Sequence, residues 1–329
     1  MIWAVNAMVG VGNGRGGPGV GHTMRALLYD QFGGNEKFRI GAVSDPLVGP
    51  DSILVRVVAA GLNPVDYKVR EGYLQQLMPT VFPVVPGWDV AGVVVRTGLD
   101  TPEFAVGDEV LAYARKDFVH GGTLAELVEV PVRTAAHKPS GLGFEDAAAL
   151  PLSGLTALQT VRRSGLGEGS TVLVHAAAGG VGSFAIQLAV MAGARVVGTA
   201  REVNHDYLRT LGAEPVPYGD DLVVAARALA PDGYDVILDY AGGQAIDTVP
   251  DLLRPGGSVV SITDGRVTGL GGIYAWVRPS GSDLAELAAL AAAGSLTVTV
   301  SEVFDLDNAA EAYQSLEGGH TRGKIVVRI

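Results

Sequence analysis

The pattern of hydrophobic and polar positions changes near residue 146. Before it, short β-branched runs alternate with Gly, Pro and Asp, and they predict strands at 24–29, 52–60, 89–97 and 126–132. Helical periodicity in this part is limited to 63–71 and 144–150. Short strands joined by tight turns are typical of an antiparallel, barrel-like domain.

After residue 147, strands and helices alternate. Strands at 171–175, 195–200, 214–218 and 234–240 are each followed by a helix, at 181–192, 206–211, 221–229 and 245–253, and a further strand follows at 258–263. This order predicts a doubly wound parallel sheet with right-handed crossovers. A helix at 282–293 and strands near 297–304 and 324–329 resemble the first part of the chain. We therefore expect one domain from 24–146 together with 281–329, and a second domain from 147–280.

Residues 1–23 differ from the rest of the chain, because between Gly10 and Gly21 about every second residue is glycine. We interpret them as a dispensable leader, with the folded protein beginning at Met24; a glycine-rich phosphate loop is the alternative. The only basic residue of the leader, Arg15, follows its apolar part, which is not the order of a signal peptide. The uncharged stretch 171–194 is interrupted by glycines, so we expect no membrane span.

Charge and cysteine content narrow the function classes. The chain has 24 Lys and Arg against 35 Asp and Glu, a net charge of −11, and no basic cluster. This argues against binding to nucleic acid or to an anionic membrane. The absence of cysteine excludes disulfides, iron–sulfur clusters, a thiolate nucleophile and zinc sites built on Cys. It also fits a reducing compartment, and we expect a cytoplasmic protein.

A glycine motif lies at the first strand-to-helix turn of the second domain. The dinucleotide fingerprint GxGxxG reads here as Ala177, Gly179 and Gly182, so its first glycine is replaced. The second glycine lets the backbone approach a pyrophosphate, which then lies at the helix N-terminus, and the third lets the helix pack on the strand. The motif predicts a dinucleotide site; a tight turn alone is the alternative.

The end of the second strand predicts the preferred nucleotide. NAD-binding sheets place Asp or Glu here, whereas this chain has Ala200 followed by Arg201. An arginine at this place can pair with a 2′-phosphate, so we expect NADPH, with Arg201 and Tyr218 near the phosphate. A solvated surface arginine is the alternative. Tyr240, Gly242 and Ile262 follow at the carboxyl ends of strands, where ligands bind in such sheets.

Five segments together resemble the zinc-independent quinone oxidoreductase group of the medium-chain dehydrogenase/reductase superfamily. They are 60–68 (AGLNPVDYK), 86–92 (PGWDVAG), 153–157 (SGLTA), 176–182 (AAAGGVG) and 322–324 (RGK). The resemblance implies an α/β protein with a GroES-like β-barrel domain, a Rossmann domain and an active site between them. It also implies a homodimer formed through the Rossmann domain, with 272–277 as a candidate edge strand. It assigns further residues to the cofactor: Asn63, Asp66, Thr156, Ala178, Gly180, Val181 and Lys324.

The same resemblance argues against a catalytic metal. Where zinc alcohol dehydrogenases have their Cys, His and Cys ligands, this chain has Asn63, Trp88 and the pair Leu152-Ser153. Without a Lewis acid, a site should prefer acceptors that delocalise the developing charge, such as quinones, enones and enals. We therefore expect an NADPH-dependent reductase of such acceptors. A reductase of thioester-bound enoyl groups and a non-enzymatic, crystallin-like NADPH-binding protein are the alternatives.

Three side chains are candidates for contact with the acceptor. They are Asn63, whose counterpart in the family lies near the nicotinamide, and Lys68 and Tyr73 on the helix that follows. Lys68 stands where several relatives of the resembled group have Tyr. Asn63 as a turn-capping residue, and Lys68 and Tyr73 as surface positions, are the structural alternatives. Asp66 and Arg70 are four residues apart, and we expect them to form an ion pair on one helix face.

Overall fold

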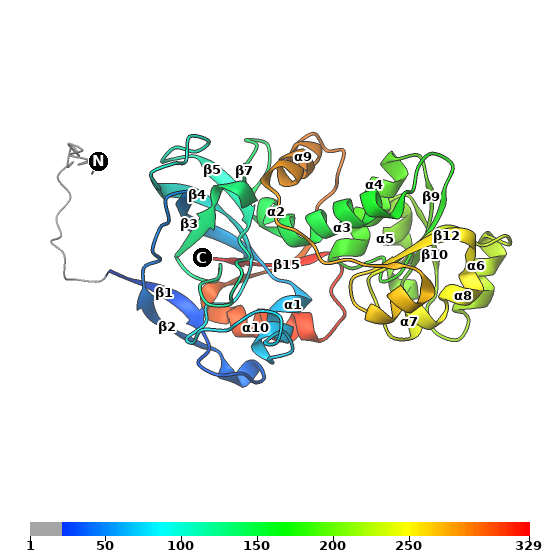
Figure 1. The fold of residues 1–329 in the computed structure, drawn as a ribbon, viewed down its shortest axis with the longest axis horizontal. Coiled ribbons are helices and arrows are strands. Elements are labelled where there is room, and N and C mark those ends of the chain that lie inside the picture. The colour runs from blue at the N-terminus through cyan, green and yellow to red at the C-terminus, as the bar shows by residue number, and fades with distance from the viewer. Residues whose placement is uncertain (1–21) are drawn as a thin grey trace, which may run out of the picture.

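The computed structural model describes residues 22–329 (Figure 1). Its N-terminal part contains a two-stranded antiparallel sheet of β1 (Thr23–Leu28) and β2 (Arg39–Ser44). Thr23, which the sequence analysis placed in the leader, is the first residue of β1 and pairs with Ser44. The remainder of the proposed leader, residues 1–21, lies outside the described residues.

A seven-stranded sheet forms the rest of the barrel-like part. Its strand order is β14-β15-β3-β4-β5-β7, with β6 also paired to β3. The two C-terminal strands join this sheet because β15 pairs antiparallel with β3, as the short-strand character of the tail predicts. The strands are β3 (Ser52–Gly61), β4 (Asp89–Thr97), β5 (Glu109–Tyr113), β6 (Leu127–Pro131), β7 (Ala135–His137), β14 (Val300–Asp305) and β15 (Lys324–Arg328).

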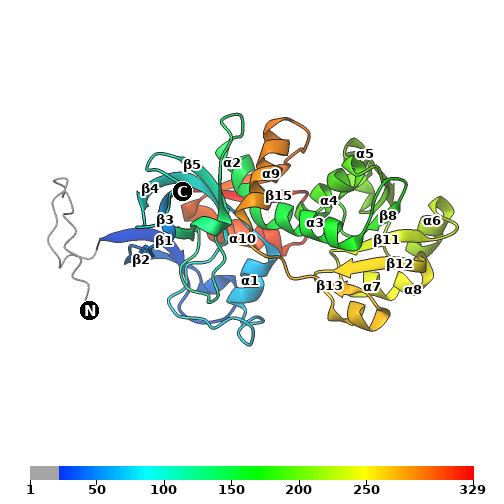
Figure 2. The same cartoon turned by 45° about the horizontal axis from the view of Figure 1, so that its top comes forward.

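The second part is a parallel sheet of six strands in the order β10-β9-β8-β11-β12-β13, which confirms the predicted doubly wound arrangement. Figure 2 shows β13 at the edge of this sheet. The strands are β8 (Thr171–Val174), β9 (Arg195–Thr199), β10 (Ala213–Val216), β11 (Tyr234–Asp239), β12 (Leu253–Ser261) and β13 (Ile273–Tyr274).

Ten α-helices connect or cover these sheets within residues 22–329. They are α1 (Pro64–Arg70), α2 (Phe144–Ala149), α3 (Pro151–Ser164), α4 (Gly180–Met191), α5 (His205–Thr210), α6 (Leu222–Leu229), α7 (Gln244–Asp247), α8 (Val249–Leu252), α9 (Gly281–Ala292) and α10 (Ala309–Glu317). No helix in this range is both long and apolar enough to cross a membrane.

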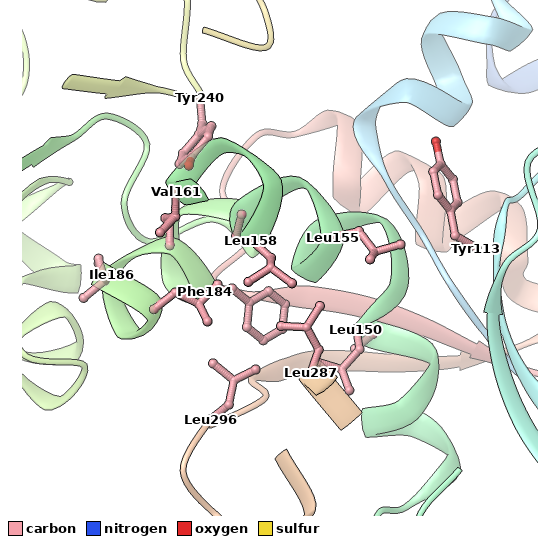
Figure 3. Packing of buried hydrophobic residues seen from close by; sticks show 14 of the residues in the cluster. Tyr113, Leu150, Leu155, Leu158, Val161, Phe184, Ile186, Tyr240, Leu287 and Leu296 are labelled. Carbon is pink, nitrogen blue, oxygen red and sulfur yellow. The ribbon is translucent and has the colours of Figure 1, made fainter. Parts of the chain in front are cut away.

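Helix α3 joins the two parts and was not predicted from the sequence. Its residues are buried around much of its circumference, so the polar–apolar alternation that marks a surface helix is weak. Leu155 and Leu158 pack in one hydrophobic cluster with Phe184 of α4 and Leu287 of α9 (Figure 3). The cluster fixes the barrel-like part against the parallel sheet and so defines the space between them.

Candidate functional site

The turn between β8 and α4 has the geometry expected of a dinucleotide-binding turn. Gly179 is the extended residue before α4. A Cβ on Gly182 would lie 2.4 Å from the carbonyl oxygen of Ala176, so this close approach of helix and strand requires glycine. Ala177, which replaces the first glycine of the fingerprint, is tolerated because residue 198 on β9 is glycine; a Cβ there would lie 2.8 Å from the Cβ of Ala177.

A cavity of about 450 Å³ opens beside this turn, at the carboxyl ends of β8, β9 and β11. Several residues that the sequence predicts for the cofactor line it: Ala178, Gly179, Ala200, Arg201, Tyr218 and Gly242. Other lining residues include His175, Asn204 and, from the C-terminal part of the chain, Gly319, His320 and Thr321. The free N–H groups at the start of α4 and the Arg201 guanidinium suit a ligand with phosphates.

Residues 319–324, here called the strap, cross from this cavity to the barrel-like part. Gly323 donates its N–H to the carbonyl oxygen of Ala178 at 2.9 Å. The Thr321 hydroxyl is buried without a hydrogen-bond partner, although the residue lines the cavity. A buried hydroxyl without a partner fits a position opposite a ligand oxygen. Residues 322–324 belong to the segments that carry the family resemblance, but only Lys324 was assigned to the cofactor from the sequence; residues 319–321 carry no motif and lie far from the fingerprint in the chain.

The strap ends in a buried polar cluster around Asn63. Lys324 Nζ donates to the Leu62 carbonyl oxygen at 2.6 Å and to Asn63 Oδ1. Asn63 Nδ2 donates to Asp89 Oδ2 at 2.8 Å, and Lys324 Nζ lies 3.7 Å from the same carboxylate oxygen. Asp89 Oδ1 accepts the N–H of Leu152 at 2.9 Å. Four segments far apart in the sequence therefore meet at one buried ion pair.

Asp66 belongs to the same cluster and caps helix α1. Its Oδ2 accepts the backbone N–H of Asn63 at 2.8 Å, while its Oδ1 is buried without a partner. Burial, with repulsion from Asp89 added, raises the pKa of Asp66 to about 7. Burial also raises the pKa of Asp89 to about 6, although Lys324 and Asn63 limit the rise. Burial lowers the pKa of Lys324, which the two carboxylates oppose.

These shifts predict that stability falls as pH rises. Between the ordinary pKa of aspartate, near 4, and the raised values, the folded protein binds more protons than the unfolded chain, so the free energy of unfolding decreases from about pH 4 to pH 7. Buried His175 has a pKa lowered to about 4, so below about pH 6.5 its own contribution makes the free energy of unfolding increase with pH.

The contribution of Asp66 is isolated by comparing wild type with Asp66→Asn, with the free energy of unfolding measured in urea at pH 5 and at pH 8. We expect Asp66→Asn to lose less stability than wild type over this interval. An equal loss in both proteins would contradict the prediction.

Other residues predicted for the cofactor lie beside the cluster or in the parallel sheet. A Cβ on Gly180 would lie 2.8 Å from Cδ of Lys324, so this glycine lets the strap approach α4. The Thr156 hydroxyl donates to the Leu152 carbonyl within α3. Tyr240 is buried, with its hydroxyl 2.7 Å from that of Thr160. Val181 and Ile262 are half-buried.

The other two acceptor candidates lie apart from the cluster. Lys68 is exposed, and Tyr73 is 74% exposed, so the structure does not bring them to Asn63. Their contact with an acceptor stays a prediction. The expected pair between Asp66 and Arg70 is wrong, because the fully buried Arg70 instead pairs with Glu317 at 2.9 Å and with Glu71 at 3.3 Å. Helix α10, which supplies Glu317, was not predicted, so this partner had no sequence signal.

Comparison with known proteins assigns this architecture. Residues 49–140 match the family model of the alcohol dehydrogenase GroES-like domain, and residues 211–327 match that of the zinc-binding dehydrogenases. The chloroplast envelope quinone oxidoreductase homolog of Arabidopsis thaliana is 31% identical over 93% of this chain and 99% of its own length. The chain belongs to the medium-chain dehydrogenase/reductase superfamily. Its resemblance to the quinone oxidoreductases, noted from the sequence, is thereby confirmed.

Further members of the superfamily agree with this assignment. The NADPH-dependent alkenal/one oxidoreductase of Arabidopsis thaliana is 35% identical over 92% of this chain and 79% of its own length. The structure of the quinone oxidoreductase from Coxiella burnetii superposes with a TM-score of 0.86 at 33% identity, covering 94% of this chain and all of that one. The chain is therefore an oxidoreductase of the superfamily, with a GroES-like and a Rossmann-like domain.

The names of superfamily relatives contradict the cytoplasmic location expected from the sequence. Both Arabidopsis proteins are named as chloroplast proteins, and a relative from Danio rerio is named as a mitochondrial oxidoreductase. The expectation rested on the absence of cysteine, which reports a reducing environment and does not separate the cytoplasm from the interior of an organelle.

The zinc positions of the superfamily contain other side chains here. Asn63 is engaged by Asp89 and Lys324, and Trp88 is buried against Tyr113 with ring centroids 6.1 Å apart. Within residues 22–329, no three His, Asp or Glu side chains gather closely enough to hold a metal ion.

Proposed function

We propose that this protein is an NADPH-dependent reductase that transfers hydride to quinones or to conjugated enones and enals, without a catalytic metal. The observation that carries the proposal is the buried cluster in which Asn63, at the position of one zinc ligand, is held by Asp89 and Lys324, together with the cavity beside the glycine turn. The names of the quinone oxidoreductase and alkenal/one oxidoreductase relatives support this substrate class.

The residues of the cavity fit the proposed cofactor. Gly179 and Gly182 allow close approach of the backbone, and the unpartnered Thr321 hydroxyl lines the same space. When bound, the reduced nicotinamide supplies a hydride to the acceptor. The chain would hold the dinucleotide along the carboxyl ends of the parallel strands, where the cavity lies.

A substrate panel tests the proposal. We expect pure protein to oxidise NADPH with quinones, enones or enals, and to be inactive with isolated ketones and simple alcohols, because an isolated alkoxide has no Lewis acid to stabilise it. Chelators should leave the rate unchanged, and metal analysis should find no stoichiometric zinc. Chelator-sensitive oxidation of a simple alcohol would refute the proposal. An enoyl thioester in the panel identifies a thioester reductase, and inactivity with every acceptor identifies a binding protein.

Preference for NADPH is proposed to depend on Arg201. Arg201 lines the cavity, and within residues 22–329 its guanidinium makes only a long contact, 3.5 Å, to the carbonyl oxygen of His320, so it remains available to a 2′-phosphate. Loss of a charge-assisted hydrogen bond costs about 1.5–3 kcal/mol. We expect Arg201→Ala to weaken NADPH binding by about 10- to 150-fold and to leave NADH binding nearly unchanged, as measured by calorimetry. Equal weakening of both nucleotides would remove Arg201 from phosphate recognition.

We also propose that the protein is a homodimer. Strand β13 ends the parallel sheet; its Tyr274 is 43% exposed, and Leu270, three residues before the strand, is 42% exposed. An exposed sheet edge with apolar side chains can pair with the same edge of a second copy. Sedimentation equilibrium of wild type and of Tyr274→Asp measures this directly; we expect the substitution to weaken the dimer.

A further inference from the structure

Arg115 spans the gap between the two domains without a hydrogen-bonded partner. It follows β5, and its guanidinium carbon lies 5.8 Å from the ring centroid of Tyr113 in the barrel-like domain and 5.6 Å from that of Trp276 in the Rossmann domain. Its Nε is buried without a hydrogen-bond partner. Over residues 22–329, no ion pair or hydrogen bond of its side chain occurs, although the residue is only partly exposed.

Both aromatic neighbours are linked to residues that the sequence places near the nicotinamide. Tyr113 is directly opposite Asp89 in the pairing of β5 with β4, and Asp89 binds Asn63. Trp276 follows Ala275, whose N–H donates to the carbonyl oxygen of Ser261, the last residue of β12. Ser261 precedes Ile262, at the strand end where a nicotinamide is expected. Arg115 therefore connects the Asn63 side of the cleft with the Ile262 side.

The other polar groups of this region are already engaged. Lys324 is fully buried against Asp89 and Leu62, and the Asn63 amide is held by Asp89 and Lys324. Arg115 is instead a permanent cation with unused N–H donors, and its guanidinium lies 5.8 Å and 5.6 Å from the centroids of two aromatic rings. Leaving such a cation without an anion is costly within a protein, so its position points to a ligand that brings negative charge.

We propose that Arg115 is a catalytic residue that donates hydrogen bonds to the acceptor oxygen on which negative charge develops. This inference rests on the proposed reductase function. Hydride adds to one end of the conjugated system, the π electrons move to the oxygen, and the enolate or phenolate formed there is stabilised by the guanidinium, which keeps its proton. Water supplies the proton that completes the reduction. Arg115 thus fills the electrostatic role that zinc has in the metal-dependent branch.

The kinetic test uses Arg115→Gln and Arg115→Lys with a neutral enone and a quinone. We expect Arg115→Gln to lower kcat by about 100-fold with a small change in KM, because the hydrogen bond strengthens only as charge develops. Arg115→Lys should recover part of kcat through its charge. Arg278→Gln is the matched control, since it removes an exposed arginine two residues after Trp276, and it should leave kcat unchanged. Unchanged kcat in Arg115→Gln with both acceptors overturns the proposal, as does an effect that appears in KM alone.

A binding test separates this inference from the proposed function. The anion 4-nitrophenolate imitates the oxygen of a reduced quinone, and its binding is followed by tryptophan fluorescence, to which Trp276 beside Arg115 contributes together with Trp3 and Trp88. We expect wild type and Arg278→Gln to bind the phenolate, and Arg115→Gln to bind it at least 10-fold more weakly while its NADPH affinity stays unchanged. Equal phenolate affinity in all three proteins overturns the assignment of Arg115. Phenolate binding by a wild type that reduces no acceptor supports the anion site and refutes the reductase function.

Discussion

Lys324→Met is expected to destabilise the protein by about 3–5 kcal/mol, because it leaves the fully buried Asp89 carboxylate without its cation. The substitution also removes the donor to the Leu62 carbonyl oxygen and to Asn63 Oδ1. Unfolding in urea at pH 7 measures the loss. We expect reductase activity to fall as well, since the Asn63 amide loses the contact that orients it.

Two further variants show whether the loss of stability in Lys324→Met comes from the buried Asp89 carboxylate that is left without a cation. Lys138→Met is a matched control: Lys138 is also buried, but its partner Glu109 is 46% exposed and can be solvated when the lysine is removed. It should therefore lose much less stability. Adding Asp89→Asn to Lys324→Met removes the charge and should restore part of the stability. If the double variant is no more stable than Lys324→Met alone, the ion pair is not the cause.

Gly182→Ala is expected to damage both stability and cofactor binding. The new Cβ would meet the Ala176 carbonyl oxygen at 2.4 Å and Ala177 Cα at 2.7 Å, and both are backbone atoms that no side-chain rotation can move. Helix α4 must shift from β8, at a cost of about 1–3 kcal/mol for overpacking. The shift displaces the N–H groups that would face the pyrophosphate, so we expect nucleotide affinity to fall at least 10-fold in calorimetry.

Gly265→Ala is the control for this substitution. A Cβ at residue 265 has no atom within 4 Å, so the same chemical change should alter neither the melting temperature nor nucleotide affinity. Wild-type nucleotide affinity in Gly182→Ala would show that the close approach at this turn is not needed for binding.

The sequence predicted elements well where local pattern and burial agree. The strand at 89–97 was predicted with the bounds that β4 has, because one β-branched run is bordered by polar residues and glycine. The helix expected at 245–253 is instead two short helices, since Pro250 lies in the first turn of α8 and restarts the chain after Thr248. Local pattern thus locates an element but does not reveal a break that tertiary packing makes acceptable.

Site residues were likewise predicted where local sequence pattern places them and missed where domain packing does. Gly179, Arg201 and Tyr218 line the cavity as expected, because each follows a strand and the carboxyl ends of parallel strands meet at one edge. His320 and Arg115 had no such signal. Arg201 meets the His320 carbonyl oxygen across 119 residues of sequence, and Arg115 meets Trp276 only because the two domains pack together. Contacts made by domain packing leave no periodicity in a single sequence.

The strap makes cofactor preference easier to redesign on one side of the cavity than on the other. His320 and Thr321 are only four and three residues from Lys324 in the same covalent segment, so a substitution there is transmitted to the ion pair with Asp89. Arg201 and Tyr218 lie outside the strap, on the loops that follow β9 and β10, and the Arg201 side chain contacts the strap at the His320 carbonyl oxygen, 3.5 Å away. A variant that reverses the proposed preference for NADPH should therefore be built from Arg201 and Tyr218, with the strap left unaltered.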